Sequence, residues 1–164
     1  MNKYDKEFIE IISPIVNADE YIKRKSMLHH EDQSVYEHSL RVAYRAYKIS
    51  KFFNVNINNC VIAALLHDFY KKSWIDDPVK KPFFQKHGFV HAREALDNSR
   101  IHFKGYLNDR IENAILRHMF PLNIVPPKYK EGWILTLSDK MVSIGEIKRL
   151  SFVLLLLGFN KKDN

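Results

Sequence analysis

An apolar run that ends in a histidine and an aspartate constrains this chain more than any other feature. Residues 60–66 are apolar on nearly every side of a helix, which is typical of the centre of a fold, and His67 and Asp68 follow directly. Adjacent helical side chains point about 100° apart, so these two polar groups cannot share one packing role. Burying both is costly unless a partner compensates them, and a divalent metal ion binds both neutral imidazole and ionised carboxylate.

Helical patterns dominate the rest of the chain. The 164 residues include only 5 Gly and 6 Pro and no long strand-like alternation, which predicts a single all-α domain. A capping box from Ser34 to Glu37 predicts the start of a helix with an apolar stripe extending to residue 53. One further helix is expected to start near residues 56–58, and another at Asn108 or Asp109, both reasonable N-caps. Other helices are expected over residues 3–13 (ending near Pro14), 18–27, 88–98 and 130–145.

Four more candidate metal ligands fall on these helical segments. His38 and His118 each share the inward face of their helix, while His91 and Asp139 lie within theirs. Taken singly, each has an ordinary explanation as a hydrogen-bonded core residue, and Asp139 could pair with Arg41. Six unpaired polar groups in one small core would cost several kcal/mol each, and one or two divalent ions would compensate the whole set. The six are His38, His67, Asp68, His91, His118 and Asp139.

The segments around these residues resemble the HD superfamily of metal-dependent phosphohydrolases. Together they cover roughly residues 30–145, the expected metal-binding core. The resemblance implies an HD-domain helical bundle, forming a single domain over residues 1–164. The matching stretches are Glu37-His-Ser-Leu-Arg-Val-Ala43, Ala63-Ala-Leu-Leu-His-Asp-Phe-Tyr-Lys71, His91-Ala-Arg-Glu-Ala-Leu96, Ala114-Ile-Leu-Arg-His118 and Leu137-Ser-Asp-Lys140.

The resemblance also implies which residues hold metal. In that family the first His, the His-Asp pair and the last Asp hold one ion, and these match His38, His67, Asp68 and Asp139. Members with two further His between the pair and the last Asp are typically binuclear. His91 and His118 match those two positions, and Asp68 is then expected to bridge the ions. Fe, Mn, Ni, Co and Zn all suit such nitrogen and oxygen ligands.

The same resemblance also implies which residues contact the substrate phosphate. Lys71 matches the Lys of the family's His-Asp-x-Gly-Lys variant, so it is expected to act with Asp68 in catalysis and to approach substrate phosphate. The Gly of that variant is Tyr70 here, and a surface role for Lys71 stays open because helix C-termini favour Lys. Arg41 matches a His-x-x-Arg-Val pattern and is expected to reach phosphate or buttress Asp68. His87, four residues before His91, is a further candidate near the substrate.

The expected function is a metal-dependent phosphohydrolase acting on a nucleotide or another small phosphorylated metabolite. Dinucleoside polyphosphates are favoured because binuclear single-domain relatives include diadenosine-tetraphosphate hydrolases, and the net charge of +7 suits an anionic substrate. A di-iron oxygenase of the same fold and a non-catalytic nucleotide sensor are the alternatives. A nucleic-acid partner is disfavoured, because the basic residues are spread along the chain without a known binding motif.

Compartment and partners follow from composition. The lone Cys60 fits a reducing cytoplasm, and the N-terminal residues lack the apolar segment of a secretory signal. The apolar run over 150–159 is shorter than the roughly 20 residues that span a bilayer, so no membrane association is expected. Residues 146–164 are expected to form an apolar docking helix and a basic tail, which could mediate a homodimer.

Overall fold

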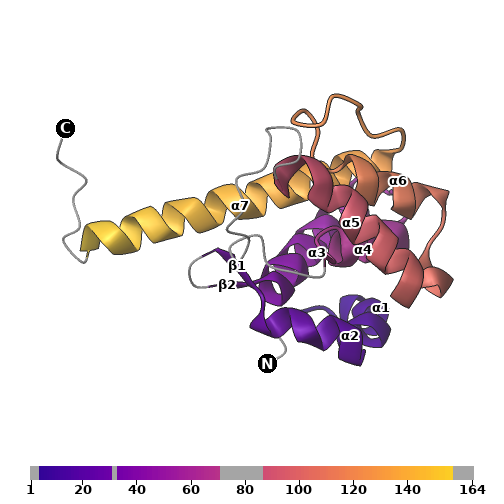
Figure 1. Cartoon of the computed structure of the whole chain (residues 1–164), viewed down its shortest axis with the longest axis horizontal. Coiled ribbons are helices and arrows are strands. Elements are labelled where there is room, and N and C mark those ends of the chain that lie inside the picture. The colour runs from indigo at the N-terminus through magenta and orange to yellow at the C-terminus, as the bar shows by residue number, and fades with distance from the viewer. Residues whose placement is uncertain (1–3, 31–32, 71–86, 157–164) are drawn as a thin grey trace.

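The structure, a computed structural model, describes the backbone of residues 4–30, 33–70 and 87–156, and the side chains of residues 4–27, 34–70 and 90–145. Helices dominate these ranges, which confirms the all-α prediction (Figure 1). The described strands are only a short antiparallel ribbon of β1 (Leu28–His30) and β2 (Gln33–Ser34).

The N-terminal segment consists of α1 (Lys6–Val16), α2 (Asp19–Ile22) and the 3-10 turn η1 (Lys23–Ser26). The prediction that α1 ends near Pro14 is wrong, because the helix continues through this proline. Proline removes one backbone donor, but Ile15 and Val16 are buried in the core beyond it, and the Asn17 N–H still donates to the Ser13 carbonyl at 3.3 Å. Tertiary packing therefore outweighs the local cost of the proline.

The two central helices are α3 (Val35–Phe52) and α4 (Ile57–Leu66), which pack against each other. The predicted capping box starts α3: the Glu37 N–H donates to the Ser34 hydroxyl at 3.2 Å, and the Ser34 N–H donates to the Glu37 carboxylate at 3.3 Å. The side chain of Asn56 caps α4, so this helix begins within the predicted range of residues 56–58. Both helices bury small residues in the same core, namely Ala43, Ala46, Cys60, Ala63 and Ala64.

The next two helices are α5 (His87–His102) and, after the short turn η4 (Lys104–Tyr106), α6 (Asp109–Arg117). The predicted N-cap Asn108 accepts hydrogen bonds from the N–H groups of Arg110 and Ile111 at 3.0 and 3.1 Å. The buried side chains of α6 all lie on one face, which packs toward α4 and α7.

The last helix, α7 (Lys130–Leu156), is longer than the predicted helix over 130–145. The start of α7 packs closely against Pro127 and the backbone of α6. A Cβ atom added at Gly132 would lie 2.6 Å from Pro127 and 3.4 Å from the Ala114 backbone. The second half of α7 extends away from the other helices (Figure 1). Residues 146–156 therefore continue α7 and do not form a separate helix, since the sequence offers no strong helix breaker there; a docking role for them stays a prediction. Residues 157–164 lie outside the described residues.

Within the described ranges, no helix combines the length and the apolar character needed to cross a bilayer.

Candidate metal centre

The structure brings the six candidate ligands together from five segments. His38 lies on α3, His67 and Asp68 follow the last residue of α4, and the others lie on or at the ends of α5, α6 and α7. Five of the six are at most 5 % exposed, and the sixth, Asp139, has a side chain that is 17 % exposed. Residues separated by up to 101 positions in the chain thus form one buried polar cluster.

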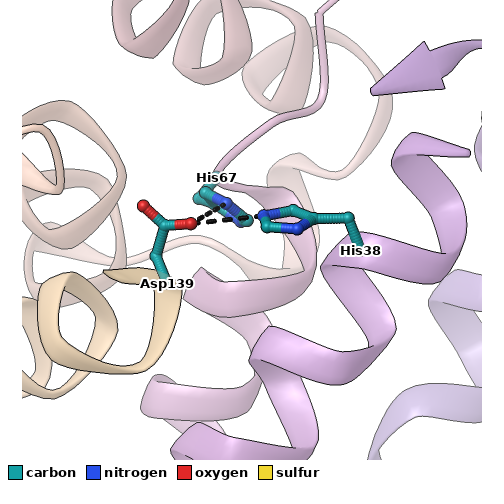
Figure 2. A group of neighbouring side chains, drawn as sticks. All are labelled: His38, His67 and Asp139. Atoms are coloured by element: carbon teal, nitrogen blue, oxygen red, sulfur yellow. Dashed lines mark hydrogen bonds and ion pairs between the residues drawn. The ribbon is translucent and has the colours of Figure 1, made fainter. Parts of the chain in front are cut away.

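One part of the cluster contains His38, His67 and Asp139 (Figure 2). The Oδ1 atom of Asp139 lies 3.2 Å from the Nε2 atom of His38 and 3.7 Å from the Nε2 atom of His67. One ligand atom from each residue lies within 4.8 Å of the other two, which is close enough for all three to contact one metal ion.

A second part of the cluster lies beside the first. The Nε2 atoms of His91 and His118 are 3.0 Å apart. Metal–nitrogen bonds of about 2.0–2.1 Å give similar separations between two nitrogen ligands of one ion. His67, Asp68 and His118 also form a group whose ligand atoms lie within 4.8 Å of one another.

Asp68 lies between the two parts. Its Oδ2 atom is 3.4 Å from His67 Nε2 and 4.0 Å from His38 Nε2. Its Oδ1 atom is 3.5 Å from His91 Nε2 and 3.9 Å from His118 Nε2. Each carboxylate oxygen therefore faces a different pair of histidines.

The local structure around His67 and His118 explains how their rings are aimed. Each is the C-cap residue of its helix, and each uses Nδ1 to bind the backbone carbonyl three residues earlier: His67 to Ala64 at 2.8 Å, and His118 to Ile115 at 2.7 Å. A carbonyl oxygen can only accept, so the network assigns the Nδ1 proton to both rings. In the neutral form, both Nε2 atoms then direct a lone pair into the cluster.

These residues fit a divalent metal ion. The Nε2 atom of His67 is buried without a hydrogen-bond partner and faces carboxylate oxygens of Asp68 and Asp139. A nitrogen lone pair directed at carboxylates is unfavourable unless a cation or a proton lies between them. A metal ion would satisfy these atoms, as well as the close nitrogen pair of His91 and His118.

The protonation of the metal-free cluster follows from the same contacts. Burial raises the pKa of Asp139, but the hydrogen bond from His38 and the close approach of His67 outweigh burial and hold this pKa well below its usual range. Burial lowers the pKa of His67, yet the charges of Asp68 and Asp139 outweigh it and raise this pKa above its ordinary value. Burial and the neighbouring His67 and His91 lower the pKa of His118 to about 3. The two carboxylates therefore favour the protonated form of His67, and a metal ion bound here would compete with that proton.

The low pKa of His118 predicts a pH dependence for the metal-free protein. His118 is neutral when folded but binds a proton near pH 6.5 when unfolded, so its contribution to stability is present above pH 6.5 and is lost as the pH falls toward 3. Between about pH 7 and pH 4.5, we expect the free energy of unfolding in urea to fall more for the metal-free wild type than for His118→Asn. His67, whose raised pKa acts with the opposite sign, is common to both proteins. An equal fall in both would contradict the assignment.

The structure describes the other three predicted site residues only in part. Arg41 lies on α3, one turn after His38. Burial raises the pKa of Tyr4, and the positive charge of Arg41 lowers it in part. His87 is the first residue of α5, but its side chain is not among those described. Lys71 lies outside the described residues. The roles of these three residues stay predictions.

Two residues that sequence reasoning missed support the backbone on either side of Asp68. Asn98, on α5, donates its side-chain N–H to the Phe69 carbonyl at 3.1 Å. Its position seven residues after His91 places it on the same helical face, which is a signal that could have identified it. The other is Tyr21, whose phenol donates to the Leu65 carbonyl. No local pattern in the sequence indicates this contact across 44 residues.

The helical fold and the buried His/Asp cluster define a protein built to hold divalent metal. The chain belongs to the HD domain family, whose model matches residues 35–143, a segment that includes all six candidate ligands. HD domains bind divalent metal ions, and membership of the family supports a metal-dependent hydrolase in general.

Comparison with solved structures found a similar chain. It is the crystal structure of a predicted HD superfamily hydrolase from an uncultured Thermotogales bacterium, with 16 % sequence identity and a TM-score of 0.48. The match covers 90 % of this chain and 74 % of that one. No curated protein sequence matches this chain.

Proposed function

We propose that this protein is a metal-dependent phosphohydrolase with two metal ions. It cleaves a phosphoester or phosphoanhydride bond of a nucleotide or another small phosphorylated metabolite, with dinucleoside polyphosphates as the favoured substrates. The observation that carries the proposal is the orientation of Asp68, whose two oxygens face different histidine pairs. One ion would be held by His38, His67, Asp68 and Asp139, and the other by Asp68, His91 and His118.

The chain's own residues supply neutral nitrogen ligands and fixed negative charge. The carbonyls of Ala64 and Ile115 hold His67 and His118 in the tautomer that leaves Nε2 available. The lowered pKa of Asp139 keeps its carboxylate ionised at neutral pH. Divalent ions bound here would polarise phosphoryl oxygen and lower the pKa of bound water, the chemistry that phosphate ester hydrolysis requires.

Substrate binding is proposed for Arg41, Lys71 and His87. Arg41 is one helical turn from His38, and Lys71 is three residues after Asp68, so each follows a candidate ligand closely in sequence. Cationic side chains form strong hydrogen bonds with phosphate oxygens, and we propose that Lys71 also stabilises charge during catalysis. The net charge of +7 favours approach of an anionic substrate.

The proposal is tested with protein loaded separately with Mn and Fe and offered dinucleoside polyphosphates, mononucleotides and simple phosphate monoesters. We expect release of a phosphorylated product that requires metal and stops when a chelator is added, with the highest kcat/KM for a nucleotide substrate. Metal-loaded protein that hydrolyses none of these compounds would contradict the proposal. Oxygen consumption by the iron-loaded protein in place of hydrolysis would favour the oxygenase alternative.

A further inference from the structure

Tyr21 is a buried residue that contacts the metal-bearing segments from outside the matched HD region. It lies on α2, whereas the family match begins at residue 35, and it is only 1 % exposed. Its hydroxyl donates a hydrogen bond to the Leu65 carbonyl at 2.8 Å. Leu65 lies two residues before His67 in the last turn of α4.

This hydrogen bond caps the end of α4. In a continuing α-helix, the Leu65 carbonyl would accept from the N–H of Phe69. The Phe69 N–H instead donates to the Leu66 carbonyl at 3.2 Å, and α4 ends at Leu66. The phenol of Tyr21 thus satisfies a carbonyl that the tightened last turn leaves without its helical partner.

The ring of Tyr21 also holds the residue that follows Asp68. It stacks on Phe69, with ring centroids 5.9 Å apart and planes within 7° of parallel. The guanidinium carbon of Arg24 lies 4.0 Å from the centre of the same Phe69 ring. Because Asp68 and Phe69 are adjacent, these contacts restrict the backbone that directs the Asp68 carboxylate into the cluster.

The same phenol reaches the other central helix. Burial raises the pKa of Tyr21, and the nearby Ser39 hydroxyl opposes part of this rise. Ser39 is buried on α3 and directly follows His38. The Tyr21 hydroxyl is therefore bonded to the end of α4 before His67 and lies near the α3 residue beside His38.

We propose that Tyr21 is a positioning residue that sets the placement of Asp68 and His67 relative to His38 and thereby raises the affinity for metal. This inference rests on the proposed metal centre. Without the hydroxyl, the Leu65 carbonyl is free to accept from the Phe69 N–H, which would extend α4 and turn Asp68 away from its place in the cluster.

The test compares Tyr21→Phe with Tyr47→Phe, since each change removes only a hydroxyl from a buried ring. Tyr47 is also fully buried and donates to the Glu7 carboxylate at 2.7 Å, but it has no contact with the segment around Asp68 among those described. Manganese affinity is measured by competition with a chelating dye, and stability by urea unfolding of the metal-free proteins. We expect manganese affinity to fall by about tenfold or more in Tyr21→Phe and to be unchanged in Tyr47→Phe.

A second variant, Ser39→Ala, removes the α3 contact while keeping the Tyr21 ring and is expected to weaken manganese binding by a smaller factor. Unchanged manganese affinity in Tyr21→Phe, with normal uptake by the wild type, would overturn the inference while leaving the metal centre in place. Wild-type protein that takes up no manganese, iron or zinc would overturn the proposed centre itself, and the inference with it.

Discussion

Asp68→Ala protein is expected to bind neither metal ion and to lose turnover by on the order of a thousandfold or more. The reason is geometric: the two oxygens of Asp68 face both histidine pairs, at distances of 3.4 to 4.0 Å. Removing the carboxylate would take a shared ligand from both proposed ions and leave His67 without its nearest carboxylate. Elemental analysis of the purified variant and a phosphate-release assay measure the two effects.

The matched control is Asp97→Ala. Asp97 is an exposed aspartate on α5 whose carboxylate lies 3.8 Å from Arg100. Exposed ion pairs of this kind contribute little to stability, so the control should keep its metal and its turnover. An Asp68→Ala protein with full metal content and full activity would refute the assignment of Asp68.

His91→Ala protein is expected to keep one metal ion per chain and to lose turnover by on the order of a hundredfold. His91 contacts only the second part of the cluster among the contacts described, through His118 Nε2 at 3.0 Å and Asp68 Oδ1 at 3.5 Å. The group of His38, His67 and Asp139 is left intact. Metal content per chain and kcat measured on the same preparation check both parts of this prediction.

Asp139→Ala provides the complementary variant, because it removes a ligand from the first part and should also leave one ion per chain. Arg93→Ala, which changes an exposed residue on the same helix as His91, is expected to change neither quantity. Loss of both ions in His91→Ala would instead mean that the two parts of the cluster bind metal as one unit.

Local sequence signals predicted where the described helices begin better than where they end. Ser34 and Asn108 each cap a helix as expected, and α4 begins within the range expected for it, because capping depends on residues only two or three positions apart. The ends near Pro14 and residue 145 were wrong. Burial of Ile15 and Val16 carries α1 past its proline, and α7 continues through residues that a local reading assigned to a separate segment.

For the candidate site too, local sequence signals predicted some features, while others depend on tertiary packing. Helical spacing was enough to place His38 and His118 on inward faces, and the buried cluster agrees with that reading. Spacing could not give the orientation of the two Asp68 oxygens, which depends on how α3, α5 and α6 pack around the end of α4. The Tyr21 contact was equally out of reach, since it joins α2 to the Leu65 carbonyl through tertiary packing.

Metal content per chain, measured by elemental analysis on protein purified without a metal-binding tag, tests the central claim most directly. The arrangement of two histidine pairs around Asp68 predicts about two equivalents of divalent metal, bound by the six candidate ligands. One equivalent would limit the site to one part of the cluster. Protein that holds no metal, even after incubation with Mn or Fe, would contradict the account.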